Sequence, residues 1–253
     1  EPPSRLVSED IRDEKVKVLR SLRLYETPEE VRRNVVRGQY TAGSIKGKPV
    51  PGYREEDKVN PESRTETYFA AKVHVDNLRW AGVPFYVRTG KRLPVKATEV
   101  VVEFKNMPSG LLFNQDNRLE PNLLVFRVNP LEGIYFKINA KKPGADWALL
   151  PVAMDFCQSG QVGINTPEAY ERLLFDAIKG DATYFTRWDE VALAWAFTDR
   201  IADAWRQSDE DLRTYAAGTW GPEEGKELLA RDGFRWWPVN GQEEDNVIWI
   251  NPN

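Results

Sequence analysis

The sequence predicts an α+β fold, in which a large, mostly antiparallel sheet carries helices packed on one face. Two observations support this class. Strand-like runs fill the middle of the chain, whereas helical patterns lie toward its two ends. Several of the strand-like runs are apolar on both sides, so both faces of the sheet are expected to be covered. Helices can cover one face, and a second subunit is the simplest cover for the other, because an uncovered apolar face would aggregate.

The chain has the composition of an ordinary folded protein. Its 253 residues are 41% hydrophobic and 29% charged, with a net charge of −4. An acidic balance argues against nucleic-acid binding, which needs a basic surface. One cysteine, Cys157, and one histidine, His74, exclude an internal disulfide and a metal cluster built from those residues. No apolar run is long enough to span a membrane and no signal peptide is visible, so a cytoplasmic location is expected.

The first elements are two helices and a strand. Ser8 is a plausible N-cap for a helix, and the run from Thr27 to Glu30 combines a capping Thr, a Pro at the first helical position and a Glu three residues after the cap. Val35–Tyr40 then reads as a short strand. From Thr41 to Pro61 glycines, prolines and charges alternate without a period, which predicts a long surface loop.

The central region contains three predicted strands. Tyr68–Val75 alternates with the period of two that a pleated strand imposes, Val83–Arg88 is rich in β-branched and aromatic residues, and a further strand covers Glu99–Lys105. One face of the first strand should carry Phe69, Ala71, Val73 and Val75, and the opposite face Ala70, Lys72 and His74.

The second half adds three strands and two helices. Leu123–Val128 and Gly133–Asn139 are predicted as a hairpin, and Leu149–Phe156 is a weaker strand candidate. A helix opens at Thr166-Pro167-Glu168 and closes at Gly180, and a second runs from about Asp189 to Gln207.

The remainder, Tyr215–Asn253, is a tail rich in tryptophan, and the sequence does not decide whether it packs. With no internal repeat and no linker, residues 1–253 are predicted to form a single domain.

A compact basic loop separates two of the predicted strands. Lys91, Arg92 and Lys96 place three cations in six residues, interrupted by Gly90 and Pro94. On an acidic chain such a cluster suits a small anionic ligand at the end of a sheet. The Cα atoms of Lys91 and Lys96 would be roughly 17 Å apart if the loop were extended, so both can hold one ligand only if the loop folds back. The alternative is a solvated turn between two strands.

Long gapless runs in the chain are specific to one family. TGKRLPVK at residues 89–96 and AYERLL at residues 169–174, within a likeness from Ile11 to Pro222, closely resemble the C-terminal domain of glucose-6-phosphate dehydrogenase. The resemblance implies a homo-oligomeric enzyme that oxidises glucose 6-phosphate to 6-phosphogluconolactone with NADP. It also implies that Lys91 and Lys96 bind the substrate and its phosphate. Asn129, at a strand end, is a weaker substrate-binding candidate, and Arg92 is interpreted as solvated.

Other residues are given structural roles. His74 lies in mid-strand with no identifiable carboxylate partner and is rejected as a general base. Arg127, like Asn129, matches a position that in some family members contacts a second, structural dinucleotide or the sugar, and it is a weak candidate for either. Trp220 stands where such members have an arginine, which argues against that second site.

Two features of a dehydrogenase are absent from the sequence. No glycines have the G-x-G-x-x-G spacing of a nicotinamide site, and the family's Asp-His substrate motif is missing. The chain alone is therefore predicted to be inactive, with no catalytic residue and no metal, and NADP is predicted to bind mainly to a separate N-terminal domain. Two alternatives stay open: a non-catalytic scaffold or regulatory module, and a sugar-phosphate-binding domain that acts alone.

Overall fold

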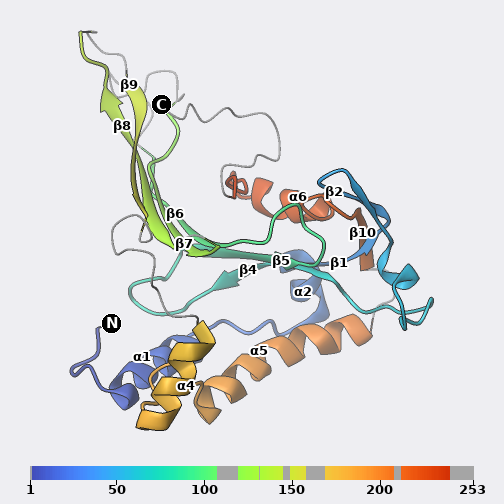
Figure 1. Cartoon of the computed structure of the whole chain (residues 1–253), viewed down its shortest axis with the longest axis horizontal. Coiled ribbons are helices and arrows are strands. Elements are labelled where there is room, and N and C mark those ends of the chain that lie inside the picture. The colour runs from blue at the N-terminus through green and yellow to red at the C-terminus, as the bar shows by residue number, and fades with distance from the viewer. Residues whose placement is uncertain are drawn as a thin grey trace. The chain divides into compact units, whose positions relative to one another are not determined.

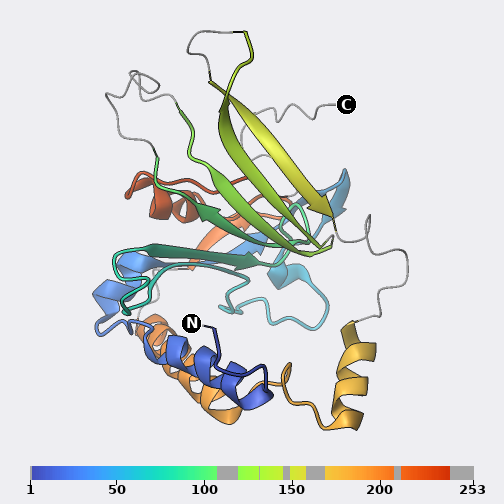
Figure 2. The same cartoon turned by 90° about the vertical axis from the view of Figure 1, so that its left-hand side faces the viewer.

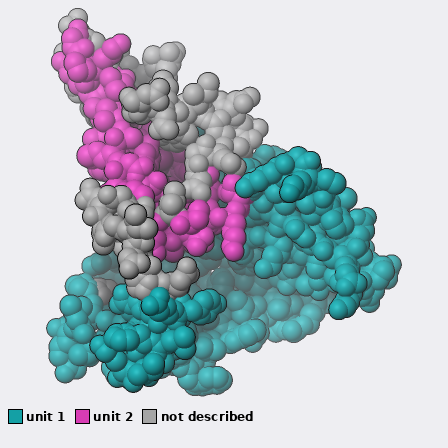
Figure 3. Space-filling view, viewed as in Figure 1, with its two compact units in different colours: residues 1–94, 168–236 teal, residues 95–167, 237–253 magenta. Residues whose placement is uncertain are grey.

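The computed structural model describes residues 2–106, 119–130, 132–144, 149–157, 169–207 and 212–239. The chain divides into two compact units, of which unit 1 comprises residues 1–94 and 168–236, and unit 2 comprises residues 95–167 and 237–253 (Figure 3). The boundary near residue 94 falls inside the basic loop. The prediction of a single domain over the whole chain stays a prediction.

Unit 1 is built on a four-stranded sheet in the order β10-β1-β4-β5. Its elements are α1 (Ser8–Arg20), α2 (Pro28–Asn34), β1 (Val35–Thr41), β2 (Gly43–Ile45), β3 (Lys48–Val50), η1 (Tyr53–Glu55), β4 (Tyr68–His74), β5 (Pro84–Gly90), α4 (Ala169–Lys179), α5 (Trp188–Arg206), β10 (Leu212–Ala216) and α6 (Glu224–Ala230). Strand β10 pairs parallel with β1, whereas β1–β4 and β4–β5 are antiparallel. Helix α6 covers one face of this sheet, and α2 and α5 cover the other (Figures 1 and 2).

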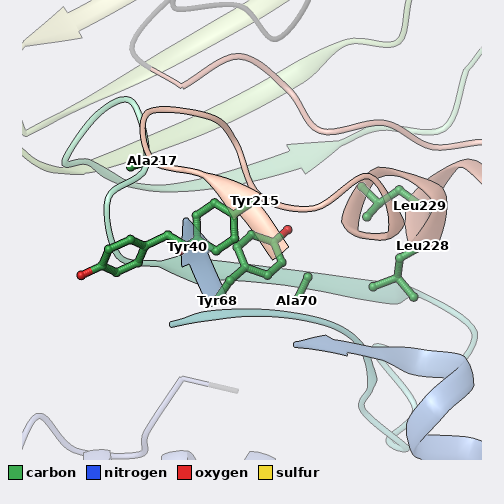
Figure 4. Packing of buried hydrophobic residues seen from close by; sticks show 7 residues of the cluster. All are labelled: Tyr40, Tyr68, Ala70, Tyr215, Ala217, Leu228 and Leu229. Atoms are coloured by element: carbon green, nitrogen blue, oxygen red, sulfur yellow. The ribbon is translucent and has the colours of Figure 1, made fainter. Parts of the chain in front are cut away.

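Strand β4 lies at the centre of unit 1 because both of its faces are apolar. Tyr68 and Ala70 point into the cluster beneath α6, whereas Ala71 points into the cluster beneath α5. Both alanines are 0% exposed. Figure 4 shows the first cluster, with the ring of Tyr215 beside that of Tyr68 at a centroid distance of 5.5 Å. The predicted alternation of this strand is confirmed.

The two N-terminal helices test the predicted helix starts. Helix α2 begins as predicted: the side chain of Thr27 accepts a hydrogen bond from the backbone N–H of Glu30 at 3.2 Å, and Pro28 occupies the first helical position. Helix α1 begins at Ser8 itself, with Val7 at the cap position and no side-chain cap. The prediction that Ser8 is the N-cap is therefore wrong by one residue.

The segment from Thr41 to Pro61 is more ordered than predicted. It contains the hairpin β2–β3 and the turn η1. Lys46 and Gly47, with φ of 51° and 76°, form the left-handed turn that two-residue hairpins require. Strands of three residues are too short to show a period in the sequence, which is why a loop was predicted.

Residues 215–236 pack within unit 1. Strand β10 extends the sheet, and Leu228 and Leu229 of α6 are buried in the first cluster. Gly221, at φ +107°, passes so close to Tyr68 that a Cβ atom there would lie 2.1 Å from the ring. Trp249 and the rest of the predicted tail lie outside the described residues, as does the predicted helix start at residues 166–168.

Unit 2 contains an antiparallel sheet in the order β6-β7-β8-β9. Its strands are β6 (Thr98–Glu103), β7 (Leu123–Asn129), β8 (Gly133–Lys141) and β9 (Leu149–Cys157). The predicted hairpin and the weaker third strand are both confirmed. The α+β class and the mostly antiparallel pairing are thus confirmed. The described strands form two four-stranded sheets and the small hairpin β2–β3, and helices cover both faces of the first sheet.

One face of the second sheet is apolar and exposed. In the register of the four strands, Val100, Phe126, Ile134 and Phe156 form one row across this face. The exposed apolar residues of the face, which are 36–54% exposed, are Val100, Phe104, Phe126, Val128, Ile134, Val152, Met154 and Phe156.

Within the part of the chain that the structure describes, no helix has the length and apolar character needed to cross a bilayer.

Candidate functional site

Lys91 follows directly on the last residue of β5. Gly90 pairs with Tyr68 of β4, and a Cβ atom on this glycine would lie 3.1 Å from the ring of Tyr68. The strand can therefore end close against the core only with a small residue at this position. The backbone of Lys91 is then fixed on both sides: its N–H donates to the carbonyl of Thr67 at 2.7 Å, and its own carbonyl accepts from the hydroxyl of Tyr215 at 2.7 Å.

The side chain of Lys91 contrasts with its backbone. It is exposed, and among the described residues no hydrogen bond or ion pair engages its amine. A cation whose backbone is held by buried groups and whose charge is unpartnered suits an anionic ligand.

The side chain of Arg92 is exposed, in keeping with its interpretation as solvated, and it is also engaged in an ion pair. Its guanidinium pairs with Glu56 at 2.6 Å, and Glu56 also accepts a hydrogen bond from Tyr40 at 3.0 Å. These two donors, the arginine first, lower the pKa of Glu56. The carbonyl of Arg92 accepts from the N–H of Gly218 at 2.8 Å, and its φ of 54° is a left-handed conformation uncommon for a residue with a side chain. Arg92 therefore contributes to the turn through its backbone, and its exposed guanidinium already has a carboxylate partner.

Lys96 and Asn129 lie at one end of the sheet of unit 2. Lys96 precedes β6 by two residues, and Thr98, the first residue of β6, pairs with Asn129 at the end of β7. Both side chains are exposed, and the amine of Lys96 has no partner among the described residues. The structure thus brings Lys96 and Asn129 to the same strand ends, while Lys91 belongs to unit 1.

Arg127 is engaged within its own sheet. Its guanidinium pairs with Asp155 of β9 and also donates to the carbonyl of Phe156 at 3.4 Å. Trp220 contacts Arg88, whose guanidinium carbon lies 4.7 Å from the centre of its ring and 4.4 Å from that of Trp236. Stacking between two indole rings stabilises the approach of residues 220–236 to β5.

His74 remains an unsuitable base. It lies at the end of β4, and burial first, followed by the positive charges of Arg23 and Lys72, lowers its pKa. The described residues contain no group of three or more His, Cys, Asp or Glu side chains that could hold a metal ion.

Sequence reasoning missed the residue that holds the Lys91 carbonyl, Tyr215, and the residue that pairs with Arg92, Glu56. Tyr215 lay in the predicted tail and Glu56 in the predicted loop. Strand β10 has the sequence LRTYA, which shows no clear alternation of apolar and polar residues that would have indicated a strand. That this strand pairs with β1, far away in the sequence, has no local signature.

Comparison with known proteins identifies the family. Residues 1–237 match the family model of the glucose-6-phosphate dehydrogenase C-terminal domain. A curated relative, glucose-6-phosphate 1-dehydrogenase of Bacillus subtilis, is 49% identical over 239 residues, which are 94% of this chain and 49% of the relative. That of Treponema pallidum is 45% identical over 93% of this chain and 46% of the relative. The chain thus spans about half the length of the curated relatives it matches.

Solved structures give the same result. The crystal structure of glucose-6-phosphate 1-dehydrogenase from Mycobacterium avium superposes with a TM-score of 0.76 at 32% identity, over 96% of this chain and 47% of that one. A glucose-6-phosphate dehydrogenase in complex with its substrate glucose-6-phosphate gives a TM-score of 0.80 at 31% identity, over 94% of this chain and 47% of that one. This chain belongs to the glucose-6-phosphate dehydrogenase C-terminal domain family.

Proposed function

We propose that the chain is the substrate-binding and dimerisation part of a glucose-6-phosphate 1-dehydrogenase, located in the cytoplasm, whose complete form oxidises glucose 6-phosphate to 6-phosphogluconolactone with NADP. The observation that carries this is a lysine, Lys91, with a fixed backbone and an unpartnered amine in a family whose solved members include a complex with glucose-6-phosphate. Residues 1–253 are proposed to act together as one domain in this role.

Three residues are proposed to bind the sugar phosphate. A phosphate monoester carries nearly two negative charges at neutral pH. The ammonium groups of Lys91 and Lys96 provide positive charge for it, each through charge-assisted hydrogen bonds. The side-chain amide of Asn129 can donate to and accept from sugar hydroxyls. Binding and orienting the substrate are the steps that this chain's own residues perform.

The residues of this chain do not fit NADP. The usual dinucleotide site needs a glycine-rich turn between a strand and a helix, and the sequence has no G-x-G-x-x-G spacing. Proton abstraction from the sugar C1 hydroxyl needs a base, and His74 lies in the sheet with a lowered pKa. We therefore propose that NADP and the base come from a separate domain and that this chain alone is inactive.

The second proposed role is homodimerisation through the sheet of unit 2. Eight apolar side chains on one face of this sheet are exposed, although a monomeric protein seldom leaves so continuous an apolar surface in water. An apolar sheet face can meet its own copy about a two-fold axis, which is the commonest arrangement of oligomers. The same face would also serve a non-catalytic scaffold, and substrate binding distinguishes the two functions.

Isothermal titration of the chain with glucose 6-phosphate tests the proposal. Lys91→Ala and Lys96→Ala should each weaken binding by about 10- to 100-fold, because each removes a charge-assisted hydrogen bond of about 1.5–3 kcal/mol. Lys48→Ala and Lys105→Ala remove exposed lysines elsewhere in the same units and should leave the affinity unchanged. Equal affinities for all four variants and the unmodified chain would refute the site and favour the scaffold.

A further inference from the structure

The turn that carries Lys91 is held by one tyrosine hydroxyl. Tyr215 of β10 is 5% exposed, and its hydroxyl oxygen lies 2.7 Å from the carbonyl oxygen of Lys91 and 3.1 Å from that of Thr67. A tyrosine has one hydrogen to donate. The shorter distance assigns that hydrogen to Lys91.

The remaining contacts complete a chain of hydrogen bonds. The side-chain hydroxyl of Thr67 lies 3.1 Å from that of Tyr215 and accepts the backbone N–H of Tyr40 at 3.0 Å. With the Tyr215 hydrogen committed to Lys91, the Thr67 hydroxyl donates to Tyr215. The relay therefore runs from the Tyr40 N–H through Thr67 and Tyr215 to the Lys91 carbonyl, and every polar group in it has a partner. Hydrogen bonds in such a buried series strengthen one another.

Burial keeps the relay in one protonation state. Removal from water raises the pKa of Tyr215 above its ordinary value. The hydroxyl therefore remains protonated, and able to donate, throughout the physiological range. Its ring packs on Tyr68 and Tyr40, at centroid distances of 5.5 and 6.3 Å, which fixes the direction of the hydroxyl.

The same turn is held at the next residue. The carbonyl of Arg92 is bonded by Gly218, three residues after Tyr215, and the Arg92 side chain is paired with Glu56. One segment, β10 and the residues after it, thus holds two successive carbonyls of the turn, while the amine of Lys91 is left free of protein partners among the described residues.

We propose that Tyr215 is a positioning residue for Lys91: by donating to the Lys91 carbonyl it holds the backbone from which the lysine amine reaches the sugar phosphate. This inference rests on the proposed role of Lys91. It assigns to β10 a part in substrate affinity, in addition to its part in the sheet. Pre-organisation of this kind lowers the entropy lost when a flexible side chain is ordered by its ligand.

The chain offers a closely matched control. Tyr25 is 7% exposed, and its hydroxyl donates to a lysine carbonyl, that of Lys72, at the same distance of 2.7 Å. Tyr25→Phe and Tyr215→Phe therefore each remove one buried hydroxyl bonded to a lysine backbone, and only Tyr215→Phe releases Lys91.

The test combines titration with glucose 6-phosphate and amide hydrogen exchange followed by NMR. Tyr215→Phe should weaken binding by about 3- to 10-fold and speed exchange of the Lys91 amide by about 10-fold, whereas Tyr25→Phe should change neither by more than about twofold. Thr67→Val, which breaks the relay, should act like Tyr215→Phe, and Thr67→Ser, which keeps the hydroxyl, should restore the unmodified affinity.

Two results would overturn the inference, and they differ from each other. If Lys91→Ala weakens binding but Tyr215→Phe binds like Tyr25→Phe, Lys91 binds the substrate without help from Tyr215. If Lys91→Ala leaves binding unchanged, the proposed substrate site itself is wrong, and the positioning role is lost with it.

Discussion

Both four-stranded sheets contain apolar strand residues, but the two sheets differ in how far these residues are covered by other parts of the chain. In unit 1, helices cover both faces, and adjacent residues of β4, Ala70 and Ala71, are each 0% exposed. In unit 2, Leu123 and Lys137 are the only residues of the four strands that are buried, and one face presents apolar side chains to solvent. Apolar patterning therefore predicts that a strand face will be covered, but it does not say whether the same chain provides the cover.

From this difference we expect the sheet of unit 1 to contribute mainly to folding stability and the sheet of unit 2 mainly to association. A core that is close-packed on both sides should respond strongly to small changes in volume. An exposed face can accommodate such changes. Its side chains contribute substantially to a free energy only when another surface buries them. Four predictions follow from this division, from the largest expected effect to the smallest.

A single methyl group at Gly221 should destabilise unit 1 most. Gly221→Ala would place a Cβ atom 2.1 Å from the buried ring of Tyr68 and would force a φ of +107° on a residue with a side chain. We expect a loss of about 3–5 kcal/mol in the free energy of unfolding, from overpacking and backbone strain together. Gly233→Ala is the control, since it has a φ of +80° but no atom within 4 Å of its Cβ position. It should cost about 1 kcal/mol. Equal losses, measured by urea unfolding, would contradict the close packing around Tyr68.

Two isoleucines allow the same truncation in both units. Ile201 of α5 is 2% exposed in the second cluster of unit 1, whereas Ile134 of β8 is 41% exposed. Ile201→Ala should lower the free energy of unfolding by about 2–4 kcal/mol, and Ile134→Ala by less than about 1 kcal/mol. Urea unfolding at protein concentrations low enough to exclude association measures both. A larger loss for Ile134 would mean that the exposed face is covered within the monomer.

A charge at the centre of the apolar face should act on association. Phe126→Glu should weaken self-association by about 30-fold or more, because placing unpaired charges in a two-fold interface should cost about 2 kcal/mol or more in total. Val87→Glu is the control, since Val87 is a similarly exposed apolar strand residue of unit 1. Sedimentation equilibrium distinguishes them. Unchanged association of Phe126→Glu, or a monomeric unmodified chain at high concentration, would remove this face as the dimer interface.

The smallest expected effect is the pH dependence from His74. Its folded pKa lies below its ordinary value of about 6.5, so the unfolded chain binds its proton more readily than the folded chain does. The stability from neutral His74 is therefore present above about pH 6.5 and is lost as the pH falls from there through the lowered folded pKa. His74→Gln should flatten the dependence of unfolding free energy on pH between 7.5 and 5.5. Since this is the only histidine, an unchanged slope would show that other groups cause it.

Local signals predicted local structure well. The period of two in β4 and the capping sequence at Thr27 each depend on neighbouring residues, and both are confirmed. Strand β10 was missed because its partner, β1, is more than 170 residues away in the sequence and the pairing is parallel. The hairpin β2–β3 was missed because its strands are too short to show a period.

The candidate site could be predicted only in part from the sequence, because contacts between segments that are distant in the sequence leave no local signal. Lys91, Lys96 and Asn129 were found through family resemblance. Their surroundings were not, because the groups that hold the loop come from remote segments. Glu56 engages Arg92, and Tyr215 holds the carbonyl of Lys91. The charge pattern does not distinguish Arg92 from Lys91, whereas the structure shows that Arg92 is paired with Glu56 and that Lys91 has no side-chain partner among the described residues.

The most direct test of the account is a crystal structure of the chain with glucose 6-phosphate. The account predicts that the amine nitrogens of Lys91 and Lys96 each lie within about 3 Å of a ligand oxygen and that the Tyr215 hydroxyl keeps its bond to the Lys91 carbonyl. A ligand bound on another surface, with both amines in solvent, would contradict it.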